Sequence, residues 1–182
     1  MTKARTLADF NTTSIPASAI TDLPSGGITM ADQWNMTTTF TGSAEPIASN
    51  WEQNDEASFS ALGSPMTEAS GVFTFPSTGI YHVIFNVGTE ANVLSSDMFE
   101  AVIQVSVDGG SNWDSGSIGQ LSQTNISGGH GQSTSVGQII DVTNTSNVKV
   151  RFEVSNASSN VYIQGSSSVR KTFATFIRLG DT

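Results

Sequence analysis

The chain has 182 residues, the length of one domain or of one domain with an arm, and a formal net charge of −9. No Lys or Arg lies between positions 6 and 148, so a basic patch for nucleic acid is not expected. The absence of cysteine excludes disulfides and thiolate metal sites, and no segment approaches the ~20 apolar residues of a membrane-spanning helix. The polar start lacks the apolar segment of a signal peptide, which predicts that the chain is not exported by the usual route.

Residues 1–28 are predicted to form an N-terminal arm. They have no strand-length alternation, and Pro16, Pro24 and the pair Gly26-Gly27 fit an extended tether. A disordered leader is the alternative for this segment. The domain itself is predicted to cover residues 29–182.

From residue 28 onward the pattern predicts strands and no helices, because β-branched and aromatic residues alternate between clusters of turn formers. The expected strands give an all-β sandwich of eight to ten antiparallel strands. A long segment rich in Gly, Ser and Gln, residues 115–133, is predicted as a loop. The expected strands and meander cover residues 34–41, 51–63, 72–75, 80–87, 99–107, 135–142, 149–155, 161–164 and 172–179.

Two of these strands are apolar on both faces. In residues 80–87, Tyr81, Val83 and Phe85 share the face predicted for the core, while His82 and Ile84 lie on the other face with Ile80 and Asn86. In the last strand, Ala174 and Phe176 share one face, and Phe173, Thr175, Ile177 and Leu179 share the other. A sandwich covers only one face of each sheet, so a partner subunit is expected over the second.

The residues Phe73, Pro76, Gly79 and Tyr81 match a Phe-x-x-Pro-x-x-Gly-x-Tyr pattern, and the end of the chain matches the last two strands of the same family. This part, roughly residues 57–180, resembles the globular head of the complement component-one recognition subunit, a relative of the tumour-necrosis-factor (TNF) domain. Thr175 stands where the family has glycine. The resemblance implies a jelly-roll β-sandwich that forms homotrimers, and leaves open whether a metal ion lies on the trimer axis. The trimer-interface residues predicted in this way are His82, Ile84, Asn86, Phe173, Thr175, Ile177 and Leu179.

The segments 3–10 and 15–20 are similar to the start of fibre-type virion proteins of tailed bacteriophages, particularly marine ones. A second block, from residues 31–34 through 46–52, is similar to a segment that recurs in the same proteins. The resemblance implies a virion component that is attached by its arm to capsid or tail proteins. The residues predicted for this attachment are Lys3, Arg5, Leu7, Phe10 and Ile15.

The segment 106–113 approximates the Asp-box pattern Ser-x-Asp-x-Gly-x-Thr-Trp, with Asn112 in place of threonine. Asp108-Gly109-Gly110 is in any case a strong hairpin-turn signal. A calcium loop would need alternating oxygen ligands, of which Asp108, Asn112 and Asp114 supply an incomplete set. We therefore predict a structural turn here and expect no metal.

Nothing in the sequence singles out a catalytic group. His82 lies in the middle of a predicted strand and His130 in a glycine-rich segment, and neither accompanies a nucleophile motif. Paired carboxylates of a glycosidase remain open in principle, because five acids are available: Glu45, Glu52, Asp55, Glu56 and Glu68.

These observations together predict a non-enzymatic structural and recognition protein without cofactors. The expected form is a trimeric knob on a phage virion, assembled in the host cytoplasm, as a tail fibre, head fibre or capsid decoration. Its arm would bind other virion proteins, and its loops would meet a host surface glycan or protein. The alternatives are a depolymerase that degrades surface polysaccharide and a secreted lectin-like binder.

Overall fold

The computed structural model describes residues 27–91, 98–122 and 130–182, and the regular structure in these ranges is all β. Within them no helix has the length and apolar character needed to cross a membrane. The strands are β1 (Met30–Met36), β2 (Phe40–Thr41), β3 (Trp51–Gln53), β4 (Thr67–Ala69), β5 (Val72–Thr74), β6 (Gly79–Ala91), β7 (Met98–Ser106), β8 (Asp114–Ser122), β9 (His130–Val142), β10 (Lys149–Ser155), β11 (Val161–Ile163) and β12 (Phe173–Gly180).

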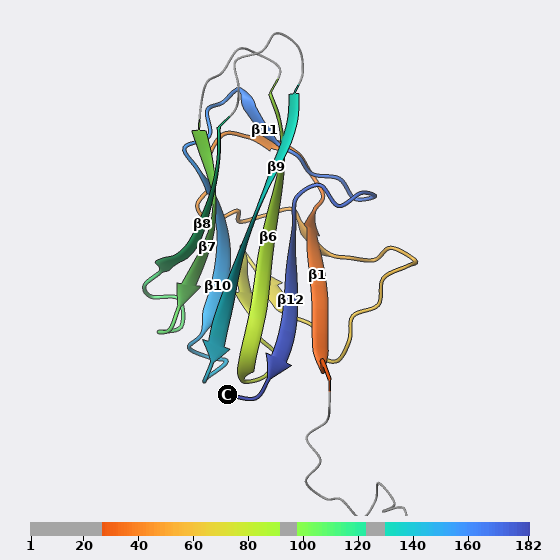
Figure 1. Ribbon diagram of the computed structural model, residues 1–182, viewed down its shortest axis with the longest axis vertical. Coiled ribbons are helices and arrows are strands. Elements are labelled where there is room, and N and C mark those ends of the chain that lie inside the picture. Colours follow the sequence, from red (N-terminus) through yellow and green to blue (C-terminus); the bar gives the residue numbers. More distant parts are fainter. Residues whose placement is uncertain (1–26, 92–97, 123–129) are drawn as a thin grey trace, which may run out of the picture.

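The strands form two antiparallel sheets packed as a sandwich, which confirms the predicted class. In the seven-stranded sheet, β9, β6, β12, β1 and β3 lie side by side, and the short strands β11 and β2 extend it beside the end of β6. The second sheet has the order β4-β5-β10-β7-β8. Figure 1 shows the two layers, with β6, β12 and β1 in one and β10 and β7 in the other.

The strands predicted on either side of the Pro-Ser-Thr-Gly turn are confirmed as β5 and β6, but they belong to different sheets. β5 pairs with β4 and β10, whereas β6 pairs with β9, β11 and β12. The turn therefore carries the chain from one layer to the other. The Tyr81 hydroxyl donates to the Ser77 carbonyl at 3.0 Å and holds this crossing. Gly79 adopts φ +144°, and a Cβ there would lie 2.6 Å from the Gly180 carbonyl oxygen, so only glycine fits.

The core lies between the sheets, and the predicted alternation places it correctly. Tyr81, Val83 and Phe85 of β6 are fully buried, as are Ala174 and Phe176 of β12. Aromatic rings from the two sheets meet there: the centroids of Phe85 and Phe152 are 4.7 Å apart, and those of Phe73 and Phe176 are 5.3 Å apart. Truncating one such ring typically costs about 3–5 kcal/mol.

A buried carboxylate joins β1 to its neighbours. Asp32 is 2 % exposed and accepts four hydrogen bonds of 2.9 Å, from the backbone nitrogens of Gln33 and Met66 and from the side chains of Trp34 and Gln53. Charge-assisted hydrogen bonds of this kind compensate for the cost of removing a carboxylate from water. Asp32 belongs to the block 31–52 noted above for its similarity to phage proteins, so this part of the block has a structural role in the fold.

The prediction of one strand over residues 34–41 is wrong. β1 ends at Met36 and pairs with β3 and β12, whereas β2 pairs with β11. The chain bends between the two strands, where the Thr37 nitrogen donates to the Asn50 carbonyl. Of the meander predicted over 51–63, only Trp51–Gln53 is a strand.

The loop predicted over residues 115–133 is also wrong in the described part, because residues 114–122 form β8 and residues 130–133 begin β9. Its glycines serve close packing: a Cβ at Gly116 would clash with the Gln138 side chain of β9, and one at Gly119 would lie 3.2 Å from the Thr134 hydroxyl. Glycine in a strand often marks such an approach. In the strand predicted over 99–107, Val107 is 70 % exposed and lies beyond β7.

Candidate functional site

The residues predicted for a subunit interface lie together on the outer face of the seven-stranded sheet. Because Ala174 and Phe176 point into the core, the alternate residues of β12 point outward. Their direct neighbours across β6 are the outward residues of that strand. The pairs are Phe173 with Asn86, Thr175 with Ile84, and Ile177 with His82.

Strands β9 and β1 extend these pairs into three rows, which we call the uncharged face. Cross-strand neighbours share one side of a sheet, so each row forms a continuous strip. Between β9 and β1 none of the rows contains a carboxylate, a lysine or an arginine, and beyond Asn35 the third row continues to Glu52 of β3. The rows are Ile139-His82-Ile177, Gly137-Ile84-Thr175-Gln33 and Ser135-Asn86-Phe173-Asn35.

Several polar side chains of the uncharged face are held by contacts within the sheet, although the Asn35 amide oxygen is buried without a hydrogen bond. The Gln33 amide nitrogen donates to the Thr175 hydroxyl at 3.1 Å, and the Asn86 amide nitrogen donates to the Lys171 carbonyl at 2.9 Å. The His82 imidazole packs over Gly137, where an added Cβ would lie 3.1 Å from Nε2. The face is therefore largely preorganised, which lowers the entropic cost of covering it.

Apolar side chains on and beside this face remain open to water in the single chain. Ile139 is 57 % exposed and Leu179 is 50 % exposed, while Ile84, Phe173 and Ile177 are half-buried. Leu179 lies at an irregularity of the β12–β6 pairing and has no direct cross-strand partner there. An uncharged sheet face of this composition is suited to contact with another protein surface.

The sequence analysis did not identify Ile139, Gly137 or Gln33 as part of this face. The Ile139-Ile140 pair in the strand predicted over 135–142 indicated that one isoleucine faces outward. The pairing of β9 with β6 was not readable from the sequence, since the two strands are separated by β7 and β8. The five residues predicted for attachment, Lys3, Arg5, Leu7, Phe10 and Ile15, lie outside the described residues.

The Asp108 segment forms the structural turn that its sequence predicts, between β7 and β8. The Asp108 carboxylate accepts hydrogen bonds from the Asn112 side chain at 2.6 Å, from the Asn112 backbone nitrogen at 2.9 Å and from the Ser106 hydroxyl at 2.8 Å. These bonds, the Asn112 side-chain bond above all, lower the pKa of Asp108 to about 2. The carboxylate is thus engaged in holding the hairpin.

Three of the acids considered for glycosidase chemistry have partners within the fold. The Glu45 carboxylate pairs with Arg151 at 3.1 Å, that of Glu56 pairs with Arg170 at 2.9 Å, and that of Glu68 accepts from the Gly71 nitrogen at 2.6 Å. In residues 27–91, 98–122 and 130–182, no three His, Cys, Asp or Glu side chains are grouped so as to hold a metal ion.

No protein-family model matches the chain, and no curated protein matches its sequence. Solved structures do match. The crystal structure of murine APRIL at pH 5.0 has a TM-score of 0.57 at 12 % identity, over 82 % of this chain and 98 % of that one. The structures of murine APRIL at pH 8.5 and pH 8.0 each have a TM-score of 0.53 at 10 % identity, with the same coverage. The fold is a TNF-like jelly roll. The expected fold class is thereby confirmed, and the similarity at this level of identity concerns the fold.

Proposed function

We propose that this chain is a structural and recognition protein of a tailed-phage virion, and that its jelly-roll domain assembles as a homotrimer through the uncharged face. The observation that carries the trimer is the set of three uncharged rows on an otherwise acidic protein. The TNF-like fold supports it, because the resemblance to that family implies this form of assembly. The virion role rests on the similarity of residues 3–20 and 31–52 to fibre-type phage proteins.

Electrostatics favour the uncharged face as the place where copies meet. Each copy has a net charge of −9, so most relative orientations bring like charges together. Around a threefold axis every side chain lies near its own two symmetry mates, which makes a charge there costly. The three rows avoid this cost between β9 and β1, and they bring apolar surface from Ile84 and Ile177 into contact.

The two ends of the domain differ in a way that suits a knob on an arm. β1 begins and β12 ends at the same end of the sandwich, where Met30 pairs with Arg178. The arm therefore joins the domain at this end, and the opposite end is free to face away from the particle. We propose that Lys3, Arg5, Leu7, Phe10 and Ile15 bind capsid or tail proteins, and that the far end meets a host glycan or protein.

The direct test is to locate the chain in intact particles. We expect the protein in purified virions by mass spectrometry, and threefold density of its size on the head or tail in electron-microscopy maps. Its absence from purified virions would overturn the virion role. New reducing ends released from host polysaccharide by the purified protein would instead support the depolymerase alternative.

A truncation tests the role proposed for the arm. A chain that starts at Ile28 retains every described strand, so its melting temperature and its trimeric mass should match those of the full chain. The truncated protein should fail to join particles in a complementation assay. A substantially lower melting temperature would show that residues 1–27 contribute to the core and that the predicted boundary is wrong.

A further inference from the structure

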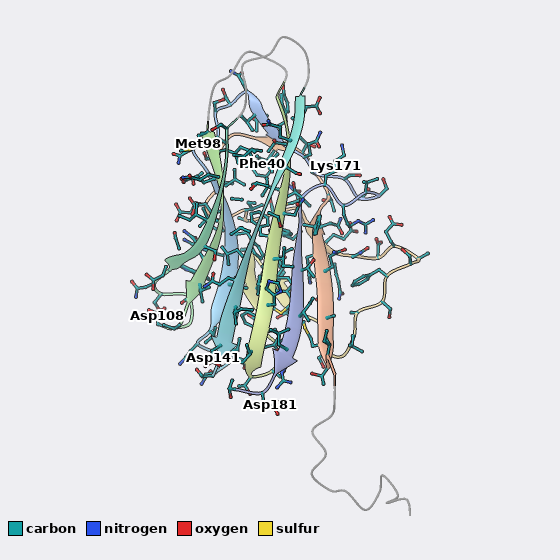
Figure 2. The ribbon with its side chains drawn as sticks, viewed as in Figure 1. Phe40, Met98, Asp108, Asp141, Lys171 and Asp181 are labelled. Atoms are coloured by element: carbon teal, nitrogen blue, oxygen red, sulfur yellow. The ribbon has the colours of Figure 1, made fainter. Side chains whose placement is uncertain are left out.

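A hollow of about 420 Å³ opens beside the uncharged face, at the end of the domain away from the arm. Its lining includes backbone at Gly88 and Gly131, and the residues Asn86, Ser133, Gln164 and Lys171 surround these glycines. In Figure 2, Lys171 lies toward one end of the sandwich, and Asp141 and Asp181 lie at the other end. The hollow is shallow and largely open to solvent, and its volume is in the range of sites for small organic ligands.

The hollow contains a positive charge that the fold leaves available. No described carboxylate pairs with the Lys171 ammonium, whereas Arg170, the other cation of the lining, is bound to Glu56 at 2.9 Å and to Asn54. The backbone at Lys171 is held in place, because its carbonyl accepts from Asn86 and packs directly over Gly88. In a chain with a net charge of −9, Lys171 is thus a cation on a fixed backbone that no carboxylate of the described residues neutralises.

The rest of the lining is rich in amides and hydroxyls. The Gln164 amide nitrogen donates to Glu90 at 2.8 Å, and its backbone nitrogen donates to the Gly88 carbonyl at 2.9 Å, which positions this side chain. The Ser133 hydroxyl makes no hydrogen bond within the described residues. Amide and hydroxyl groups both donate and accept, which matches the hydroxyl groups of a sugar ring.

We propose that this hollow binds a sugar that carries a carboxylate, such as a uronic acid. Lys171 pairs with the carboxylate, and Ser133 and Gln164 bind the ring hydroxyls. A small inorganic anion fits less well, because tight phosphate sites gather several donors around one group and the hollow has a single available cation. This inference deepens the proposed recognition role and rests on it for its biological meaning, but binding itself requires only the folded chain.

The test uses the full-length protein and three probes in calorimetric or NMR titrations: glucuronate, glucose and inorganic phosphate. We expect glucuronate to bind, and glucose to bind at least about tenfold more weakly, because a charge-assisted hydrogen bond is lost. Shifts of the Lys171 and Ser133 amide signals should accompany binding. Equal binding of phosphate and glucuronate would overturn the proposal in favour of a simple anion site. No binding at tens of millimolar glucuronate would overturn it as well.

Variants at Lys171 provide a second test of the proposal. Lys171→Gln should weaken glucuronate binding about tenfold, and Lys171→Arg should retain it, since the charge is kept. Lys3→Gln, which changes the net charge equally outside the described residues, is the matched control and should bind as the wild type does. Unchanged binding in Lys171→Gln, with an unchanged melting temperature, would overturn the assignment. Because these titrations need neither particles nor a particular oligomer, a failure here is separable from failure of the trimer or virion role.

Discussion

The outer face of the five-stranded sheet has a network of charged and amide side chains, whereas the polar side chains of the uncharged face are neutral amides and hydroxyls and one histidine. On the five-stranded sheet, the Gln104 amide nitrogen donates to Glu153 at 2.7 Å and to Glu45 at 3.1 Å. Arg151 in turn pairs with Glu45 at 3.1 Å and donates to the Gln104 oxygen. The two outer faces of one sandwich thus differ in whether charged groups or uncharged groups are exposed to water.

On the five-stranded sheet, the charged side chains of the outer face find their partners within the same chain. On the five-stranded sheet, the Arg151 guanidinium lies 4.5 Å from the centre of the Trp113 ring, and the Lys149 ammonium donates to Thr74 and to the Thr145 carbonyl. Such partners within the chain produce a surface that is stable in water. The uncharged face has fewer such partners: the Asn35 amide oxygen is buried without a hydrogen bond, and Ile139 is exposed. It is the face that the proposed trimer would cover.

The largest effect is expected from a charge placed on the uncharged face. Thr175→Arg puts three guanidinium groups near one axis without partners and should convert the trimer to monomers at micromolar concentration, as measured by light scattering. Thr67→Arg, at an exposed position of β4 on the other sheet, is the control and should remain trimeric. A trimeric mass in folded Thr175→Arg would contradict the assignment.

Ile139→Arg offers a second variant in case Thr175→Arg does not fold. Ile139 is 57 % exposed in the single chain, so the substitution should not disturb the core. It lies in the same row as His82 and should also weaken the trimer.

A second prediction concerns the buried hydrogen bonds of Asp32, which hold β1, one of the strands of the uncharged face. Asp32→Ala leaves four donors around β1 without their shared acceptor and should lower the free energy of unfolding by roughly 2–4 kcal/mol in urea denaturation. Asp55→Ala, which removes an exposed carboxylate nearby in the sequence, should change it by less than about 0.5 kcal/mol. Similar values for the two variants would show that Asp32 does not hold β1 and β3 together.

A third, smaller effect should appear on the charged face. Burial, and then the negative charge of Glu45, raise the pKa of Glu153 above its usual 4.5. The folded chain therefore binds this proton more tightly than the unfolded chain, so its contribution to stability is present below pH 4.5 and is lost as pH rises through the raised pKa. Glu153→Gln cannot ionise and should melt at a higher temperature than the wild type at neutral pH. The difference should vanish below about pH 4.5; a constant difference at all pH values would contradict this account.

The smallest effect is expected at the turn beside the charged face. The lowered pKa of Asp108 means that its contribution to stability is present above pH 3.8 and is lost as pH falls toward about 2. Asp108→Ala should therefore slightly lower the melting temperature at neutral pH and match the wild type near pH 2. Equal melting temperatures at neutral pH would show that the bonds from Asn112 and Ser106 do not stabilise the hairpin.

The sequence predicted well where local pattern and physical environment coincide. The alternation in β6 and β12 identified Tyr81, Val83 and Phe85 as core and placed His82 and Ile84 outside, because one strand has two faces and a sandwich buries one of them. It predicted poorly where composition conflicts with packing. Gly116 and Gly119 suggested a loop, yet they lie in a strand because β8 approaches β9 too closely for side chains.

Local sequence by itself thus determined the all-β class, the faces of the long strands and the turn at Asp108, since each depends on residues close together in the chain. Tertiary structure decided which strands lie side by side. It brought β9 and β1 next to β6 and β12, so that Ile139 and Gln33 joined the uncharged face, and it placed Lys171 over Gly88. These contacts join residues tens of positions apart, and their choice depends on the packing of the whole sandwich rather than on any local pattern.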